Sequence, residues 1–398
     1  MSKYEKRGIN FKEVSFDLSR IMQEKENIVK ELCNGIDQLM STHKIDVIKG
    51  SGTLLNNHEV EILQNETEKR ITQSGKNIIL ATGSTPIDLP FASADGVQIL
   101  NSTHMLSLEQ VPEKMIIAGA GVIGIELGSV WKRLGADVTI IELMPQFLPM
   151  ADRQVSQFGL RYLKAQGLNF YFGEKIESIS KENSEITVNI SDANQNKKSY
   201  LCNQLFIAAG RKPLLENVLG KNSSVSLDKK GKIIVNKNYE TTLPGVYAIG
   251  DIIDGPMLAH KAEKEGVAVA EIISGNPYSV NYRTIPNVIY TLPEIAWFGE
   301  TEEQLTGQNI SYKTGKAYFK PNGRAKAMSE EDGFIKIIVS SENDLILGAH
   351  IVGAQASELI HVLSIAMQNN ITSKALAQTC FAHPSLSEIL NDALHSIR

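Results

Sequence analysis

The chain has 398 residues, a formal net charge of −5 and an isoelectric point near 6.0. Hydrophobic residues at 42% and charged residues at 21% are ordinary for a globular protein. This weakly acidic balance gives no electrostatic case for nucleic acid or an anionic membrane as a partner. The length allows two or three domains, each large enough for its own core.

The cysteines and the N-terminus bear on metal binding and compartment. Cys33, Cys202 and Cys380 are too widely separated for a disulfide framework or a metal site, so we expect three buried structural thiols and no metal. The charged residues 1–7 precede no apolar signal core, so we expect a cytoplasmic protein. The longest apolar run, 115–131, is glycine-rich and contains a glutamate, which makes it a poor membrane span.

Apolar periodicity predicts the first elements. Residues 17–40 carry apolar side chains at three- and four-residue steps, which predicts one amphipathic helix with Asp17 as its N-cap. Three short alternating runs then predict a small antiparallel sheet: 46–49, 60–63 and 70–72. A buried strand at 77–81 runs into Thr82-Gly83-Ser84.

The centre of the chain is a strand followed by a glycine-rich turn and a helix. Apolar residues 115–118 lead into Gly119, Gly121 and Gly124, spaced G-x-G-x-x-G, and a helical pattern continues to about residue 133. In such a unit the first glycine makes the turn, the second admits a pyrophosphate and the third allows close helix packing. The phosphates bind to free N–H groups at the helix N-terminus, so the unit predicts a dinucleotide site.

A second apolar run, 137–141, ends on Glu142, which lies 18 residues after Gly124. An acid at this place bonds the ribose hydroxyls and repels a 2′-phosphate, which favours NAD over NADP. The alternative is a glycine-rich structural turn, which the full context of strand, helix and acid disfavours.

The pattern changes near residue 286. Before it we expect a helix at 151–165, short strands with turns over 168–210, a strand ending at Gly250-Asp251 and a helix at 258–273. After it come four strand-like runs and then two helical ones: 289–297, 312–319, 334–339 and 346–352, followed by 356–368 and 385–396. Strands grouped before helices predict a separate α+β domain.

Together these landmarks resemble the pyridine nucleotide–disulfide oxidoreductase family, and within it the dihydrolipoamide dehydrogenases. The segments that carry the resemblance are I-L-A-T-G-S at 79–84, the glycine unit at 119–135, A-A-G-R-K-P at 208–213, T-T-L-P-G-V-Y-A-I-G-D at 241–251, M-L-A-H-K-A-E-K-E-G at 257–266 and A-H-P-S-L-S-E at 382–388. They occur in family order and span the chain from about Tyr4 onward.

The resemblance implies an α/β fold with tandem FAD- and NAD-binding Rossmann-like domains, the first one truncated, and a C-terminal α+β dimerisation domain. The implied domains are the remainder of the FAD-binding domain at 1–113, the NAD-binding domain at 114–240, a second part of the FAD or central domain at 241–283 and the dimerisation domain at 284–398.

The resemblance also implies FAD and NAD as cofactors and assigns their residues. Those implied for FAD are Thr82, Gly83, Ser84, Asp251 (on a ribitol hydroxyl), and Met257, Leu258, Ala259 and His260 along the isoalloxazine. Glu126 is also implied as a cofactor-binding residue. Those implied for NAD are Gly119, Gly121, Gly124, Glu142 and Gly210. His383, steadied by Glu388, would exchange a proton with a lipoyl dithiol and serve the partner subunit's flavin, which implies a homodimer.

Three of these assignments have a structural alternative. Asp251 could cap the following helix, and His383 by itself could be a packed or surface histidine. Ser385-x-x-Glu388 is a capping box, which can coexist with a catalytic role for the glutamate.

The sequence departs from the family pattern at two places. The family begins with a glycine-rich βαβ unit for FAD and a C-x-x-x-x-C redox disulfide, whereas no G-x-G-x-x-G precedes residue 119 and no two cysteines here lie within five residues. We therefore expect weakened FAD binding and impaired activity, and Glu126 loses the lysine partner that the family places beside the disulfide. Phe381 stands where many relatives carry a second histidine, a small change.

Several explanations remain open. A truncated or mis-started reading frame is favoured, followed by a split protein with a separate N-terminal piece, and then by a non-catalytic NAD-binding or dimerising protein. The implied partner is the lipoyl domain of a 2-oxo acid dehydrogenase or glycine cleavage complex, with no choice among such complexes. Mercuric and glutathione reductases are alternative relatives that Glu142 disfavours, since they use NADPH.

Overall fold

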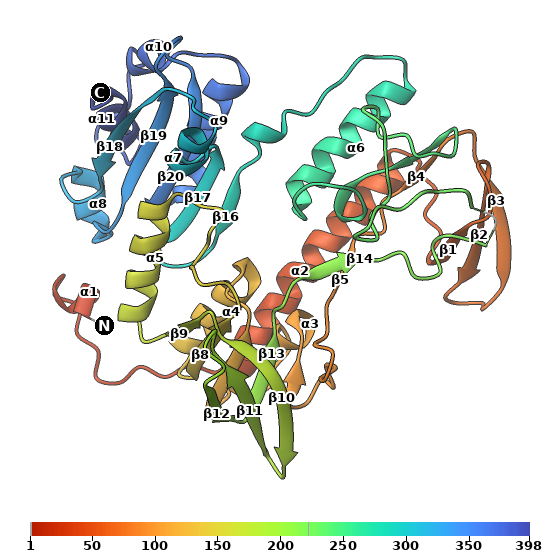
Figure 1. The fold of residues 1–398 in the computed structure, drawn as a ribbon, viewed down its shortest axis with the longest axis horizontal. Helices are drawn as coiled ribbons and strands as arrows, with labels where there is room; N and C mark the ends of the chain where they lie inside the picture. Colours follow the sequence, from red (N-terminus) through yellow and green to blue (C-terminus); the bar gives the residue numbers. More distant parts are fainter. Residues whose placement is uncertain (1, 222) are drawn as a thin grey trace. The chain divides into compact units, whose positions relative to one another are not determined.

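The computed structural model describes residues 2–221 and 223–398 (Figure 1). The chain forms two compact units. Unit 1 comprises Met1–Phe16, Asp88–Ala209 and Asn281–Arg398, and unit 2 comprises Asp17–Ile87 and Gly210–Val280. Each unit is therefore assembled from segments that lie far apart in the sequence.

Unit 1 contains a five-stranded parallel sheet built around the glycine-rich turn. Its strands are β6 (Ile99–Leu100), β13 (Gln204–Ile207), β7 (Lys114–Ala118), β8 (Asp137–Glu142) and β9 (Asn169–Phe172), in the order β6-β13-β7-β8-β9. Helix α4 (Val122–Arg133) joins β7 to β8, as the sequence predicts. The apolar residues of β7 are buried, as expected for a parallel strand that is covered on both faces.

An antiparallel layer and three helices complete this part of unit 1. The layer consists of β10 (Lys175–Glu182), β11 (Glu185–Ser191) and β12 (Lys197–Cys202). The helices are α1 (Ser2–Glu5), α3 (Ser102–Met105) and α5 (Arg153–Ala165). The predicted helix at 151–165 begins two residues late because Asp152 is its N-cap and accepts the Gln154 N–H at 2.9 Å.

The C-terminal part of unit 1 is an antiparallel sheet with helices, which confirms the predicted α+β arrangement. The strands are β16 (Asn287–Ile289), β17 (Glu294–Gly299), β20 (Ile346–Gly353), β19 (Phe334–Ser340) and β18 (Tyr312–Tyr318), in that spatial order. The helical elements are η2 (Tyr282–Thr284), α7 (Glu302–Gly307), α8 (Gly323–Met328), α9 (Ala356–Gln368), α10 (Ser373–Ala377) and α11 (Glu388–His395). Helix α9 and the buried faces of β17, β19 and β20 share one hydrophobic core.

Two predicted boundaries in this region are wrong. The single strand predicted at 289–297 is two strands, because Asn287 pairs with Trp297 across a reversal and Pro293 has no N–H for a ladder. The helix predicted from residue 385 begins at Glu388, since the side chain of Glu388 itself holds the Ser385 N–H at 2.8 Å.

Unit 2 begins with α2 (Leu18–Thr42), where the predicted helix and N-cap are confirmed. The Asp17 carboxylate accepts the Arg20 N–H at 3.2 Å. The antiparallel sheet that follows is β1 (Gly50–Leu54), β2 (Glu59–Gln64) and β3 (Arg70–Ser74). The first strand was predicted at 46–49 and lies at 50–54 instead, because the register that buries Leu54 pairs it with Val60.

Short strand pairs and one helix form the rest of unit 2. Strand β4 (Ile78–Leu80) runs parallel to β15 (Val246–Ala248), and β5 (Ser84–Pro86) runs antiparallel to β14 (Arg211–Pro213). The turn η1 (Gly250–Ile252) and helix α6 (Ala259–Ile273) follow β15. The sequence predicts β15 and α6 at nearly these positions, and together with Leu54 and Leu80 they contribute to one core.

The cysteines differ from expectation. Cys202 is buried and burial raises the pKa of its thiol to about 12, so this thiol is inert at neutral pH. Cys33 and Cys380 are exposed, so the expectation of three buried thiols is wrong for two of them. Among the described residues no group of His, Cys, Asp and Glu could hold a metal ion. No helix within the same residues is long and apolar enough to cross a membrane.

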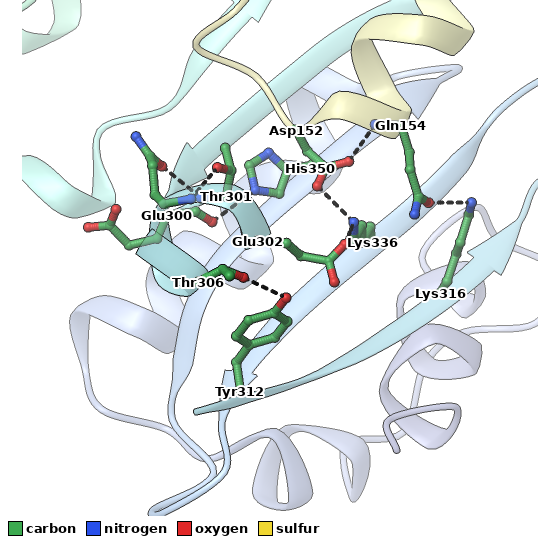
Figure 2. A network of polar contacts seen from close by, with 11 residues as sticks. Asp152, Gln154, Glu300, Thr301, Glu302, Thr306, Tyr312, Lys316, Lys336 and His350 are labelled. Carbon is green, nitrogen blue, oxygen red and sulfur yellow. Dashed lines mark hydrogen bonds and ion pairs between the residues drawn. The ribbon is translucent and has the colours of Figure 1, made fainter. Parts of the chain in front are cut away.

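A buried polar network ties α5 to the antiparallel sheet of unit 1 (Figure 2). Lys336 on β19 donates to Asp152 at 2.7 Å and also contacts Glu302 at the start of α7. Beside them His350 on β20 is fully buried, and its Nε2–H donates to the Glu300 carbonyl at 3.1 Å. These charged side chains pair only with particular partners. They therefore fix the contact between α5 and the sheet more specifically than apolar packing alone would.

Candidate functional site: a glycine turn, a carboxylate turn and a histidine–glutamate pair

The three glycines of the dinucleotide turn perform three different tasks. Gly119 has φ +114°, and an added Cβ would lie 2.5 Å from the Ala208 carbonyl oxygen, so only glycine fits there. A Cβ at Gly124 would collide with the Gly119 carbonyl, so glycine is required where α4 meets the turn. A Cβ at Gly121 would meet nothing within 4 Å. Gly121 therefore borders the open space that a pyrophosphate needs.

Glu142 lies directly at this turn. It ends β8, and its Oε2 accepts the Ala120 N–H at 2.6 Å while its Oε1 accepts the Met144 N–H at 2.8 Å. The predicted acid and the glycine loop are therefore brought together across 22 positions of sequence. A carboxylate at this place stands where the ribose of a dinucleotide bound to the turn would lie.

The N-terminus of α4 is available to an anion. Gly121 is the N-cap residue and offers no side chain, so no side chain caps the first turn of this 12-residue helix. The free N–H groups and the positive end of the helix therefore face the space beside Gly121. Glycine geometry, helix end and carboxylate together form one site.

A second constellation lies in unit 2, where two strand ends meet. The Ser84 hydroxyl donates to Asp251 Oδ2 at 2.5 Å, which joins the Thr82-Gly83-Ser84 segment to the Gly250-Asp251 turn. Arg211 on β14 donates to the Ser84 hydroxyl at 2.7 Å and to the Ser84 carbonyl at 2.6 Å. Asp251 is therefore held by a side chain from β5, and the alternative of a simple helix cap does not describe it.

The neighbouring predicted residues are ordered around the same turn. Thr82 donates its hydroxyl to the Leu214 carbonyl at 2.7 Å, and Gly83 has φ +72° with open space where a Cβ would lie. Leu258 is the N-cap of α6, so the segment from Met257 to His260 leads from the Asp251 turn into that helix. Gly210, with φ +120°, lies between β13 and β14, and its place beside the NAD turn stays a prediction.

Arg211 is a site residue that the sequence analysis did not single out. Its segment, A-A-G-R-K-P at 208–213, carries part of the family resemblance, and Arg211 is one of the two charged residues in it. An arginine four residues after the end of β13 resembles any surface charge in a sequence. Only its bonds to Ser84 place it at the site.

His383 and Glu388 form the predicted pair. His383 Nδ1 lies 2.8 Å from Glu388 Oε1, and the imidazole is 80% exposed while the carboxylate is 27% exposed. The Ser385 N–H and then His383 lower the pKa of Glu388 below its ordinary value, so the carboxylate is charged at neutral pH. The pair presents an oriented imidazole to solvent.

The capping box at Ser385 is only half formed. Glu388 accepts the Ser385 N–H, but among the described residues the Ser385 hydroxyl has no hydrogen-bond partner and Ser387 is the N-cap of α11. Glu388 therefore serves both the loop backbone and His383 through its two oxygens.

Glu126 has a partner, contrary to the expectation that it would lack one. Its Oε1 accepts the Tyr290 N–H at 2.8 Å, which links α4 to the segment between β16 and β17. Burial raises the pKa of Glu126, and the bond from Tyr290 offsets only part of that rise. The residue is a structural acceptor in this chain, with no lysine involved.

Comparison with known proteins identifies the class. The family model described as pyridine nucleotide-disulphide oxidoreductase matches residues 3–266, and the dimerisation domain of the same family matches residues 285–394. The chain therefore belongs to the pyridine nucleotide–disulphide oxidoreductase family, whose mixed α/β fold it has.

Within this family the chain is similar to dihydrolipoyl dehydrogenases. It is 40% identical over 381 residues to the mitochondrial enzyme of Caenorhabditis elegans, covering 95% of this chain and 77% of that one. It is 39% identical over 390 residues to the human mitochondrial enzyme, covering 97% of this chain and 76% of that one. These relatives define an oxidoreductase family that uses FAD and NAD.

Two solved structures match the fold of this chain over most of its length. An HOCl-induced flavoprotein disulfide reductase of Escherichia coli, solved as a Cu(II) complex, matches with a TM-score of 0.87 at 26% identity, over 96% of this chain and 86% of that one. LpdA from Mycobacterium tuberculosis matches with a TM-score of 0.88 over 96% of this chain and 84% of that one, and at 24% identity it shows the fold alone.

The residues present fit NAD fully and FAD in part. NAD fits because the open space at Gly121, the free end of α4 and the Glu142 carboxylate match its pyrophosphate and ribose. For FAD the Asp251 carboxylate fits the hydroxyls of the ribityl chain. The sequence holds no second G-x-G-x-x-G before residue 119 to take the FAD pyrophosphate.

Proposed function

We propose that this chain is a dihydrolipoyl dehydrogenase-type flavoprotein, which exchanges electrons between a dithiol substrate and NAD. The observation that carries the proposal is the oriented His383–Glu388 pair, since an exposed imidazole fixed by a carboxylate suits proton exchange with a thiol. Similarity to dihydrolipoyl dehydrogenases over nearly the whole chain supports the same substrate class.

The site residues have distinct roles in this proposal. Gly119, Gly121 and Gly124 bind the NAD pyrophosphate, and Glu142 bonds the adenosine ribose and disfavours a 2′-phosphate. Asp251, held by Ser84, receives a flavin ribityl hydroxyl. When bound, the flavin supplies the hydride chemistry, while His383 takes or returns the thiol proton at its ring nitrogen.

We further propose that the chain alone is impaired in dithiol oxidation. The reaction class needs two neighbouring thiols, whereas the three cysteines lie at positions 33, 202 and 380. Cys202 has its pKa raised to about 12 by burial and is thus a poor thiolate. A cysteine pair supplied by another polypeptide segment would restore the missing acceptor.

The remaining assignments complete the proposal. The domains are 1–113, 114–240, 241–283 and 284–398, with the last forming a homodimer in which His383 serves the partner subunit's flavin. The macromolecular partner is the lipoyl domain of a 2-oxo acid dehydrogenase or glycine cleavage complex. The proposed compartment is the cytoplasm, although several similar enzymes carry "mitochondrial" in their names.

The test is NADH-driven reduction of lipoamide by the purified chain, followed at 340 nm and accompanied by NADH and FAD titrations. We expect NADH binding, weak FAD binding and no turnover. Turnover by the chain alone would contradict the proposed impairment, and absence of NADH binding would contradict the site at Gly119–Gly124. Size-exclusion chromatography with light scattering checks the homodimer.

A non-catalytic, NAD-binding and dimerising protein is the second candidate. The scattered cysteines favour it. The discriminating experiment adds a peptide segment that contains a C-x-x-x-x-C pair and the missing glycine-rich βαβ unit. If lipoamide reduction recovers and depends on His383, the result favours the proposed enzyme. If flavin binding is restored but lipoamide reduction is not, the result favours the non-catalytic protein.

A further inference from the structure

We propose that Lys261 and Glu265 are positioning residues that set the Gly250–Asp251 turn for a flavin ribityl chain. This inference rests on the proposed function, because it assumes that Asp251 receives the flavin. It assigns a task to two buried charges that the proposed chemistry does not otherwise use.

The two side chains hold both peptide groups of one residue. Lys261 Nζ donates to the Gly250 carbonyl at 2.9 Å, and the Gly250 N–H donates to Glu265 Oε2 at 2.7 Å. The two side chains also bond each other, with Lys261 Nζ 3.0 Å from Glu265 Oε1. They lie one turn apart on α6, so a single helix face holds Gly250 from both sides.

Burial makes this arrangement costly, which argues for a specific task. Both side chains are 0% exposed, and a buried ion pair commonly stabilises a fold no better than apolar residues of the same volume. Apolar side chains, however, could not satisfy the Gly250 N–H and carbonyl. Hydrogen bonds to charged groups are short and strong, so the pair fixes the backbone at this residue more tightly than neutral groups would.

Gly250 is a residue whose conformation needs such support. Its φ is +75°, and a Cβ there would lie 3.2 Å from Ala262 Cβ, so α6 packs directly against the turn. Glycine is the most flexible residue, and fixing it costs the most backbone entropy. The charged pair therefore holds the peptide that immediately precedes Asp251.

The position of Gly250 determines where the Asp251 carboxylate points. Asp251 follows Gly250 directly, and its Oδ2 accepts the Ser84 hydroxyl at 2.5 Å. Among the described residues Oδ1 has no hydrogen-bond partner and is the oxygen offered to a ribityl hydroxyl. Lys261 and Glu265 thus act through the backbone, while Ser84 acts on the carboxylate itself.

The experiment removes the two supports in steps and measures FAD affinity by quenching of flavin fluorescence. Lys261→Met with Glu265→Leu removes both hydrogen bonds to Gly250 and is expected to raise the Kd for FAD by at least about tenfold, since bonds to charged groups are the strong ones. Lys261→Met with Glu265→Gln keeps an acceptor for the Gly250 N–H and is expected to raise the Kd by about threefold to tenfold. Lys261→Gln with Glu265→Gln keeps the acceptor for the Gly250 N–H and offers a neutral donor that is one atom shorter than Lys261, so its Kd is expected to rise no more than that of the variant that keeps one bond.

Thermal unfolding and a matched variant separate positioning from folding. The apolar pair leaves the buried Gly250 N–H and carbonyl without these partners and is expected to melt at a lower temperature than wild type, so FAD affinity is measured well below that transition. Glu263→Gln with Lys264→Gln changes the same charges at exposed positions of α6 and is expected to leave the Kd unchanged. If the apolar pair does not fold, the variant that keeps one bond decides the question.

The outcomes are distinguishable. Wild-type affinity in the folded apolar pair, or in the variant that keeps one bond, overturns this inference and leaves the proposed function intact. A wild-type chain that binds no FAD overturns the flavin part of the proposed function and this inference with it. A graded loss in the order of the bonds removed supports both.

Discussion

Asp152 and Lys336 form a buried ion pair at 2.7 Å, although 184 positions separate them in the sequence. Their side chains are 1% and 3% exposed. Burial by itself would raise the pKa of Asp152, but the hydrogen bond from Lys336 and the nearby positive charges hold it below its ordinary value. Burial likewise opposes the charge on Lys336, and its two carboxylate partners nevertheless raise its pKa.

Loss of Lys336 is therefore expected to destabilise unit 1 strongly. Lys336→Met leaves Asp152 as an uncompensated buried charge, which costs about 3–5 kcal/mol in comparable cases. The measurement is the urea midpoint of unfolding followed by tryptophan fluorescence. Lys313→Met on the neighbouring strand β18 is exposed and serves as the control, with little expected change. Equal midpoints for the two variants would contradict the importance of the pair.

His350 next to this pair predicts a loss of stability in weak acid. Burial lowers the pKa of His350, and the described charged groups that face it are Asp152, Lys336 and Glu303. Its folded pKa lies below the unfolded value of about 6.5, so its contribution to stability is complete above that pH and is lost as the pH falls towards the folded pKa. Asp152, whose pKa is also lowered, adds a loss that begins only near pH 4.

The measurement is the melting temperature between pH 8 and pH 5 for wild type and for His350→Phe. We expect the wild type to lose stability below about pH 6.5 and the variant to lose the component due to histidine. The variant also lacks the bond to the Glu300 carbonyl, so its absolute stability is lower and only the slope with pH is compared. Parallel slopes would show that His350 does not titrate on unfolding.

Gly121 and Gly124 are expected to separate NAD binding from folding. Gly121→Ala places a methyl group in open space, so the melting temperature is expected to be unchanged while the Kd for NADH rises about tenfold or more because the methyl group obstructs the pyrophosphate. Gly124→Ala places a methyl group against the Gly119 carbonyl and is expected to lower the melting temperature. Intrinsic NADH fluorescence and thermal unfolding give both readouts, and unaltered NADH binding by Gly121→Ala would remove the turn from the site.

Glu142 is expected to set the preference for NADH over NADPH. Glu142→Gln keeps the size of the side chain but removes its charge and one of its two acceptor oxygens, so the ratio of the two affinities is expected to fall by about tenfold. The amide oxygen accepts only one of the Ala120 and Met144 N–H groups in its former place, so a moderate loss of stability is also expected, and the affinities are measured below the melting temperature. Glu113→Gln at an exposed position is the control. An unchanged ratio would place cofactor selection elsewhere.

Local patterns predicted the elements and sites whose residues lie close together in the sequence. The Asp17 cap, the turn at Gly119–Gly124 and the pair of His383 and Glu388 all involve partners within a few residues of one another. The first strand of unit 2 was misplaced because its register depends on the burial of Leu54 against a later strand. The partner of Glu126 was missed for the same reason, since Tyr290 is 164 positions away.

The sequence by itself determined the family, the glycine turn with Glu142 and the pairing of His383 with Glu388, because glycine spacing, apolar periodicity and short-range hydrogen bonding are local properties of a chain. Only the tertiary structure decided how the Asp251 carboxylate is held and which charges are buried. Ser84, Arg211 and Asp251 come from three separate segments, and Lys336 meets Asp152 only after the sheet has formed. Such partners follow from burial, where an unpaired charge is costly, and burial is a property of the folded chain as a whole.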